Sequence, residues 1–216
     1  MTVSLLPLVR RWRSRPCAWV VCCLLTGAVQ LAAHQAPPEK RPEPDADQKS
    51  RAETKIKDLF KDEYAQSDAA ARIALAGKLL QLGLDTKDDV AARFMLCREA
   101  RDLAARAGDV GLSLRAVDAI AKEYEIDSVG MKRLALSTAE PVVRTPEGNK
   151  QLAEAALAVA DEAVGNDDYD TALGLLAMAD SAARKSKGRE LLSLVDARKT
   201  RLRGIAEAYD GVKAVA

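Results

Sequence analysis

Residues 145–186 read TPEGNKQLAEAALAVADEAVGNDDYDTALGLLAMADSAARKS, and this stretch decides the fold. It opens with a strong helix start signal. Thr145 supplies an N-cap hydroxyl, Pro146 suits the first helical turn, and Glu147 places a carboxylate where the helix dipole favours it. The signal predicts a helix that runs to about Val164.

A break at residues 165–167 (Gly-Asn-Asp) separates this helix from a second one, which Asp167 or Asp168 caps and which runs to about Lys185. The first helix carries two adjacent apolar stripes, so burial on two sides is expected. The stripes consist of Leu152, Ala156, Val159 and Ala163, and of Ala153, Leu157, Ala160 and Val164. The short break and the two-sided burial predict an antiparallel αα-hairpin that packs against further helices.

The same start and stop signals predict helices along the rest of the chain. These helices lie at about 51–65, 68–83 after Ser67, 88–107 after Thr86, 110–124 after Gly108-Asp109, 128–140 before Pro141, and 190–213 after Gly188. Valine and isoleucine do not alternate with polar residues, so no strand is predicted. The predicted fold is all-α, with about eight helices over residues 51–216 stacked as antiparallel αα-hairpins in a short solenoid or bundle.

Within the second half of the hairpin, an aromatic residue, two small residues and a larger apolar one have a spacing suited to close helix packing. They are Tyr169, Ala172, Leu176 and Ala179, and the same spacing occurs at Val110, Ser113, Val117 and Ile120. The pattern resembles the second helix of a tetratricopeptide repeat. This resemblance implies TPR-like helix pairs at roughly 88–124 and 147–186, in a class of repeat proteins that mostly bind other proteins. The stretch from Ile56 to Ala104 is also similar to exported bacterial proteins of uncharacterised function.

The first 36 residues predict a signal peptide. Four arginines between Arg10 and Arg15 precede an apolar stretch at 17–33, and small residues follow it. Cleavage near Ala33 to Ala36 would export the chain to the periplasm or the extracellular space, with only transient membrane contact; an uncleaved anchor is the alternative. Residues 37–50 begin with four prolines in eight residues and are expected to form a charged, solvated linker.

The predicted mature chain is chemically plain. It has no His and no Trp, and its single thiol is Cys97, which we expect to be buried and inert among apolar helix neighbours. His catalysis, His-ligated metal sites and disulfides within one chain are therefore excluded. Asn166, Asp168 and Asp170 have the spacing of a calcium loop, but the loop lacks its Gly and its Glu, so we interpret the acids as helix caps. No catalytic residue, cofactor or metal ligand is predicted.

Charge patterning argues against nucleic-acid binding. Loss of the four signal-peptide arginines takes the formal net charge from +1 to −3, whereas binding to phosphates needs a large positive excess. One local excess of positive charge remains in a C-terminal basic cluster. This cluster either docks an acidic partner or forms a solvated helix face. The cluster consists of Arg184, Lys185, Lys187, Arg189, Arg198, Lys199, Arg201 and Arg203.

The last predicted helix carries a seam with alternating spacings of four and three residues, typical of a coiled coil. The seam consists of Leu191, Val195, Arg198, Leu202, Ile205, Tyr209 and Val212. Either it closes the bundle of its own chain, or it pairs two copies of the chain as a homodimer. In both arrangements the stem of Arg198 has to pack while its charged head reaches solvent or a carboxylate.

Three functions follow as hypotheses. The first is an exported, non-enzymatic helical-repeat module that binds or scaffolds another protein. The second is a self-assembling structural protein that dimerises through its last helix. The third, an envelope hydrolase that uses carboxylates alone, has the weakest support because no convergent set of perturbed groups is visible in the sequence.

Overall fold

A computed structural model describes the chain from residue 39 to residue 213, with side chains described to Ile205. The predicted signal peptide lies outside these residues. Every regular element within them is a helix, which confirms the all-α prediction. The helices are α1 (Ala46–Leu59), α2 (Lys61–Tyr64), α3 (Ala69–Asp85), α4 (Val90–Ala107), α5 (Val110–Glu123), α6 (Ser128–Ala139), α7 (Pro146–Gly165), α8 (Tyr169–Ser186) and α9 (Arg189–Lys213).

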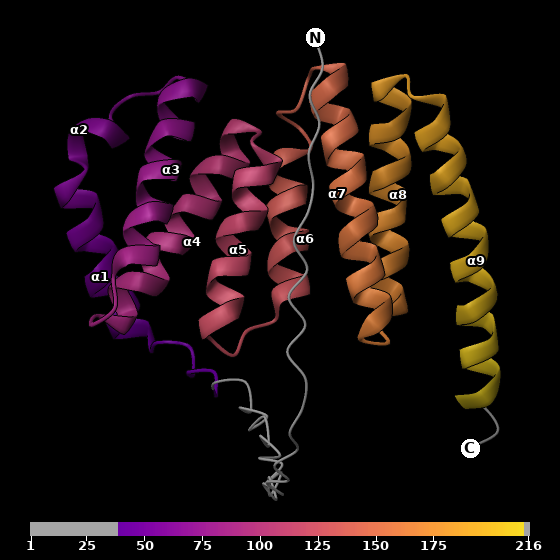
Figure 1. Cartoon of the computed structure of the whole chain (residues 1–216), viewed down its shortest axis with the longest axis horizontal. Coiled ribbons are helices and arrows are strands. Elements are labelled where there is room, and N and C mark those ends of the chain that lie inside the picture. Colours follow the sequence, from indigo (N-terminus) through magenta and orange to yellow (C-terminus); the bar gives the residue numbers. More distant parts are fainter. Residues whose placement is uncertain (1–38, 214–216) are drawn as a thin grey trace, which may run out of the picture. The chain divides into compact units, whose positions relative to one another are not determined.

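Helices that follow one another in the sequence stand side by side within the described part of the chain (Figure 1). The largest contacts join α7 to α8, α3 to α4 and α4 to α5, which are the pairs that short connections bring together. The predicted hairpins at 88–124 and 147–186 correspond to α4–α5 and α7–α8.

Two apolar cores lie within the described residues. The N-terminal core contains buried side chains of α1, α3, α4 and α5, with Phe94 and Tyr124 at its centre. Their rings meet edge to face at 5.2 Å, and the Tyr124 hydroxyl donates to the Val90 carbonyl at 2.7 Å. The C-terminal core contains buried side chains of α6, α7, α8 and α9. Helix α5 contributes to both cores, through Ile120 to the first and through Val110 to the second.

A lysine ties α5, α6 and α7 together between these cores. Lys132 on α6 is only 8 % exposed, and its Nζ lies 2.8 Å from Asp118 on α5 and 2.8 Å from Glu162 on α7. Burial alone would lower the pKa of Lys132, but hydrogen bonds to the two carboxylates outweigh this effect, so its pKa is raised. The amine is therefore held in its charged form as a three-helix link.

Most helix ends lie where the caps predict. Thr145 caps α7 through a hydrogen bond from the Gly148 N–H, and Asp168 caps α8 in the same way from Thr171. Gly108 ends α4 in the left-handed conformation with φ at 82°, and Asp109 then caps α5.

Two predicted caps are wrong by one to three residues. Asp68, not Ser67, caps α3, and Asp89, not Thr86, caps α4. The Thr86 hydroxyl instead donates to the Leu82 carbonyl at 2.7 Å, so it completes the end of α3. In both cases the true N-cap is an aspartate, one residue after Ser67 and three residues after Thr86.

The N-terminal part of the domain differs from the expected linker at 37–50. Helix α1 begins at Ala46, because Asp45 and Gln48 form a capping box in which each side chain bonds the other's backbone N–H. Before it, Pro44 is buried, and Arg41 pairs with the segment after α5. The solvated linker therefore does not extend past residue 40.

The expected helix at 51–65 is interrupted once. Phe60 leaves the helical conformation at φ −109° and ψ 25°, and this separates α1 from the short α2. Its side chain is 5 % exposed in the N-terminal core. The count within the described residues is nine helices rather than eight because of this break.

Candidate functional site

The residues that resemble a tetratricopeptide helix lie at helix contacts. On α8, Ala172, Leu176 and Ala179 are buried in the C-terminal core, while Tyr169 is half-buried and its hydroxyl donates to Asp167 at 3.0 Å. The matching residues of α5 are all buried: Val110, Ser113, Val117 and Ile120. The seven buried side chains of this set pack between helices and offer no surface to a ligand.

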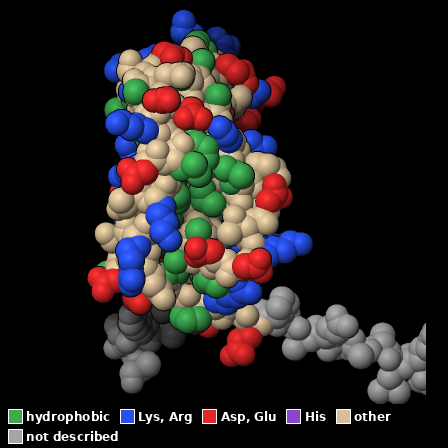
Figure 2. All heavy atoms as spheres, turned by 90° about the vertical axis from the view of Figure 1, so that its left-hand side faces the viewer, with side chains coloured by type: hydrophobic (Ala, Val, Ile, Leu, Met, Phe, Trp, Pro, Cys, Tyr) green, Lys and Arg blue, Asp and Glu red, His purple; other side chains and the backbone are tan. Residues whose placement is uncertain are grey.

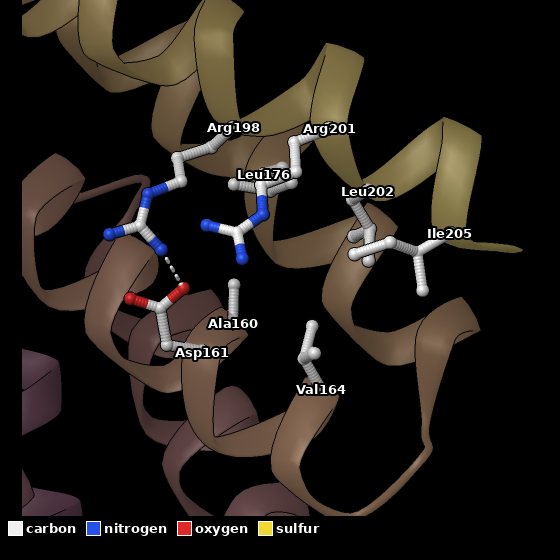
Figure 3. A pocket seen from close by; sticks show the side chains of 8 residues that line it. All are labelled: Ala160, Asp161, Val164, Leu176, Arg198, Arg201, Leu202 and Ile205. Atoms are coloured by element: carbon white, nitrogen blue, oxygen red, sulfur yellow. Dashed lines mark hydrogen bonds and ion pairs between the residues drawn. The ribbon is translucent and has the colours of Figure 1, made fainter.

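The predicted seam of α9 packs against its own chain as far as its side chains are described. Val195 is fully buried and Leu202 is 4 % exposed, both in the C-terminal core, and Leu191 packs against that core. Arg198 is half-exposed and forms an ion pair with Asp161 on α7 (Figure 3). The side chains of Tyr209 and Val212 lie outside the described residues. From Leu191 to Ile205, the contacts therefore agree with the interpretation that α9 closes the bundle of its own chain.

Four of the eight residues of the C-terminal basic cluster form ion pairs within the described part of the chain. Asp180 accepts from Arg184 at 3.1 Å and lies 3.1 Å from Lys199, and both contacts lower the pKa of its carboxyl, led by the Lys199 hydrogen bond. Lys185 lies 3.8 Å from Glu140, and Arg198 pairs with Asp161. In the described part of the chain Lys187, Arg189, Arg201 and Arg203 have no such partner, so the cluster is not one continuous cationic surface.

The described residues contain no group of three or more His, Cys, Asp or Glu side chains that could hold a metal ion. Cys97 is 2 % exposed, and burial raises the pKa of its thiol to about 11, so the predicted buried thiol is confirmed. None of the helices described combines the length with the apolar character that a bilayer crossing requires.

The structure also contains a concave surface that was not predicted from the sequence. A groove of about 820 Å³ runs between α1 and the α3–α4 connection. Leu59 and Leu82 expose 74 % and 38 % of their surface at this groove, although both are large apolar residues. On the same end of the molecule, apolar side chains gather in the middle of the face with both charge signs around them (Figure 2).

The groove, called here the α1–α4 groove, has an apolar floor and two oppositely charged rims. Ile56, Val90 and Leu96 contribute to the floor. Arg51 and Lys55, one turn apart, line the groove from α1, and Asp88 and Asp89 line it from the segment just before α4; the two pairs are called here its basic and acidic rims. No ion pair within residues 39–205 uses any of these four charges, although Asp89 also caps α4.

This groove could not be predicted from the sequence, because the residues next to Leu59 do not indicate that its side chain is exposed. Ala52, Ile56 and Phe60 recur every four residues and are buried, so Leu59 looks like a continuation of the same apolar stripe. In the structure Leu59 is nevertheless 74 % exposed. No family model, no curated protein and no solved structure matches this chain.

Proposed function

We propose that this chain is an exported, non-enzymatic helical module that binds another protein through the α1–α4 groove. The observation that carries the proposal is the 74 % exposure of Leu59 beside the apolar floor of that groove. A single exposed leucine is ordinary, but an exposed leucine at the edge of an apolar groove is typical of an interaction site.

The dimensions of the groove suit a helix of the partner. Its lining on α1 extends from Gln48 to Leu59, and eleven steps of about 1.5 Å give a length of about 17 Å, or three turns. Helix-in-groove recognition reads apolar anchors at spacings of three and four residues. An amphipathic helix with two or three such anchors would cover Leu59 and Leu82 together.

The charged rims specify the flanks of that helix. Arg51 and Lys55 favour acidic residues on the flank that lies along α1, and Asp88 and Asp89 favour basic residues on the opposite flank. A helix inserted the other way round would place like charges next to each other on both sides. The rims thus select one orientation of the partner.

Export and the non-enzymatic character rest on the sequence. The arginine-led apolar segment at 1–36 supports export, and the lack of His in the predicted mature chain removes the commonest acid/base group. The resemblance of α7–α8 to a tetratricopeptide helix pair supports an interaction role. Mass spectrometry of the secreted product tests the export part, because it reads the cleavage site directly.

Site-specific photo-crosslinking tests the binding surface. A photoreactive phenylalanine replaces Leu59 in the α1–α4 groove, and the matched control places it at Leu194, which is 48 % exposed on α9. We expect a defined crosslinked protein from position 59 and none from position 194. Lys55→Glu combined with the position-59 probe should reduce the yield at least several-fold, because it reverses the charge of one rim.

The outcome also separates the alternatives. A crosslinked product that contains two copies of this chain would support self-assembly in place of partner binding. Equal products from positions 59 and 194, or none from position 59 in envelope fractions, would contradict the proposed surface.

A further inference from the structure

A second site lies at the other end of the row of helices, where α9 crosses α7. Arg198 and Arg201 stand one turn apart on α9, and both guanidinium groups project toward α7 (Figure 3). Asp161 on α7 pairs with Arg198. Two cationic groups thus lie beside one carboxylate, which pairs with Arg198 only. Like charges three residues apart on a helix disfavour each other.

The neighbouring acidic residues do not supply a carboxylate partner for Arg201. Glu162, the next residue on α7, is bound to Lys132 on the other side of that helix. Asp180 on α8 already holds Arg184 and Lys199. Within the described residues Arg201 therefore has no carboxylate partner, although it faces the same pocket as Arg198.

The remainder of the pocket is aliphatic. Its lining consists of Ala160, Val164, Leu176, Leu202 and Ile205, in addition to the charged groups. The pocket has a volume of about 130 Å³. This is enough room for a short branched aliphatic group.

The arrangement joins two requirements in one place. A guanidinium fork binds a carboxylate with two parallel hydrogen bonds, and this geometry is specific for planar anions. An aliphatic floor beside it gains free energy from a short hydrocarbon group but gives nothing to inorganic anions. A ligand that carries both groups a few atoms apart would satisfy both.

We infer that the α7–α9 pocket binds an aliphatic carboxylate, with the carboxylate on Arg201 and Arg198 and the hydrocarbon group among Val164, Leu176 and Ile205. This site is distinct from the α1–α4 groove and does not depend on the function proposed for that groove. Two sources carry this chemistry: the C-terminal residue of another protein, and a free short-chain carboxylic acid.

Fluorescence anisotropy with two labelled peptides tests the inference on the purified protein. Both peptides end in leucine; one has a free C-terminal carboxylate and the other a C-terminal amide. We expect saturable binding of the free acid and at least tenfold weaker binding of the amide, since the amide cannot form the charged pair of hydrogen bonds. Competition with isovalerate identifies the source, because displacement at similar concentration points to a free acid and weak displacement points to a chain end.

Arg201→Gln and Arg203→Gln form a matched pair of variants. Both remove one positive charge from α9, but only Arg201 lines the pocket. Arg201→Gln should weaken binding of the acid roughly tenfold, whereas Arg203→Gln should leave it within about twofold, with helicity by circular dichroism unchanged in both. Equal binding of acid and amide, equal effects of the two variants, or no binding of the acid would each overturn the inference.

Discussion

A methyl group on Gly83 would lie 2.6 Å from the Sγ of Cys97, so α3 and α4 pack at this point with no room for a side chain. The same methyl group would also meet the Leu96 Cβ at 3.3 Å and the Arg93 carbonyl at 3.4 Å. Gly83 is in the interior of a helix, where glycine is otherwise unfavourable. The glycine therefore serves close contact between the two helices.

Gly83→Ala should destabilise the protein by about 1–2 kcal/mol, because the cost of overpacking exceeds the gain of up to about 1 kcal/mol from helix propensity. Gly77→Ala in the same helix is the control. A methyl group there meets nothing within 4 Å, so only the propensity gain applies and stability should rise by about 0.5–1 kcal/mol. Urea unfolding followed by circular dichroism measures both, and stabilisation by both variants would show that α3 and α4 can separate at no cost.

The buried thiol of Cys97 should react slowly. Because burial raises its pKa to about 11, about one thiol in a thousand is ionised at pH 8. We expect labelling by an alkylating reagent to be at least about 100-fold slower in the folded protein than in denaturing guanidinium chloride. Mass spectrometry of the peptide that contains Cys97 measures this rate separately from the N-terminal cysteines; comparable rates in the two conditions would mean that α4 opens readily.

Stability should fall as the pH rises above about 9. Burial raises the pKa of Cys97 to about 11, from an ordinary value of 9.0, so between these values the folded state binds more protons than the unfolded state. The free energy of unfolding therefore decreases with pH, by about 2–3 kcal/mol over this window from Cys97 alone. Burial also raises the pKa of Tyr64, which donates to the buried Glu99 at 2.9 Å, and this adds to the decrease at higher pH.

Thermal unfolding at pH 8, 9 and 10 checks the direction of this effect. Cys97→Ala should flatten the decrease between pH 9 and pH 10, before tyrosines ionise in the unfolded chain near pH 10. An identical pH dependence in the variant would assign the loss to other groups.

The α7–α8 contact should tolerate no added volume on its buried side. Ala179 on α8 is fully buried in the C-terminal core, whereas Ala177 on the same helix is exposed. Ala179→Leu should destabilise by about 1–3 kcal/mol, because three extra carbons have to displace neighbouring helices of this core, among which α7 has the largest contact with α8. Ala177→Leu should stay within about 0.5 kcal/mol. Similar losses from both substitutions in chemical denaturation would indicate that the two helices are not in close contact.

Leu202→Glu distinguishes the two arrangements considered for the last helix. Leu202 is 4 % exposed in the C-terminal core, so a carboxylate there should destabilise the fold by about 3 kcal/mol or more. Leu194→Glu on the same helix is the control, with 48 % exposure and an expected change within about 0.5 kcal/mol. Sedimentation velocity is measured alongside: a dimer that dissociates in Leu202→Glu with full helicity would favour the homodimer seam instead.

Local chemistry explains what could be predicted from the sequence. Caps such as Thr145, Asp109 and Asp168 act within one helical turn, so their effect is readable from three or four neighbouring residues. The buried spacing from Leu191 to Leu202 is likewise a property of one helix. These features placed seven helices of the described chain, α3 to α9, within about two residues of their observed ends.

The features that could not be predicted depend on contacts between residues far apart in the sequence. The break at Phe60 is accompanied by burial of its side chain in a core built by α3 and α4, and exposure of Leu59 depends on where those helices stand. The pocket between α7 and α9 depends on how the last helix crosses a helix thirty-odd residues earlier. No residue pattern within a single segment carries this information.

The backbone hydrogen bonds of Arg41 determine which part of the domain a pulling force on the N-terminal segment reaches first. The Arg41 N–H donates to the Glu123 carbonyl at 2.8 Å, and the Glu125 N–H donates to the Arg41 carbonyl at 2.8 Å. A pull on the preceding segment, as on a chain held by its N-terminal end, reaches these two hydrogen bonds before it reaches α1. The force therefore acts first on the end of α5, the helix that contributes to both cores. It acts on α1 only after the two hydrogen bonds of Arg41 have broken.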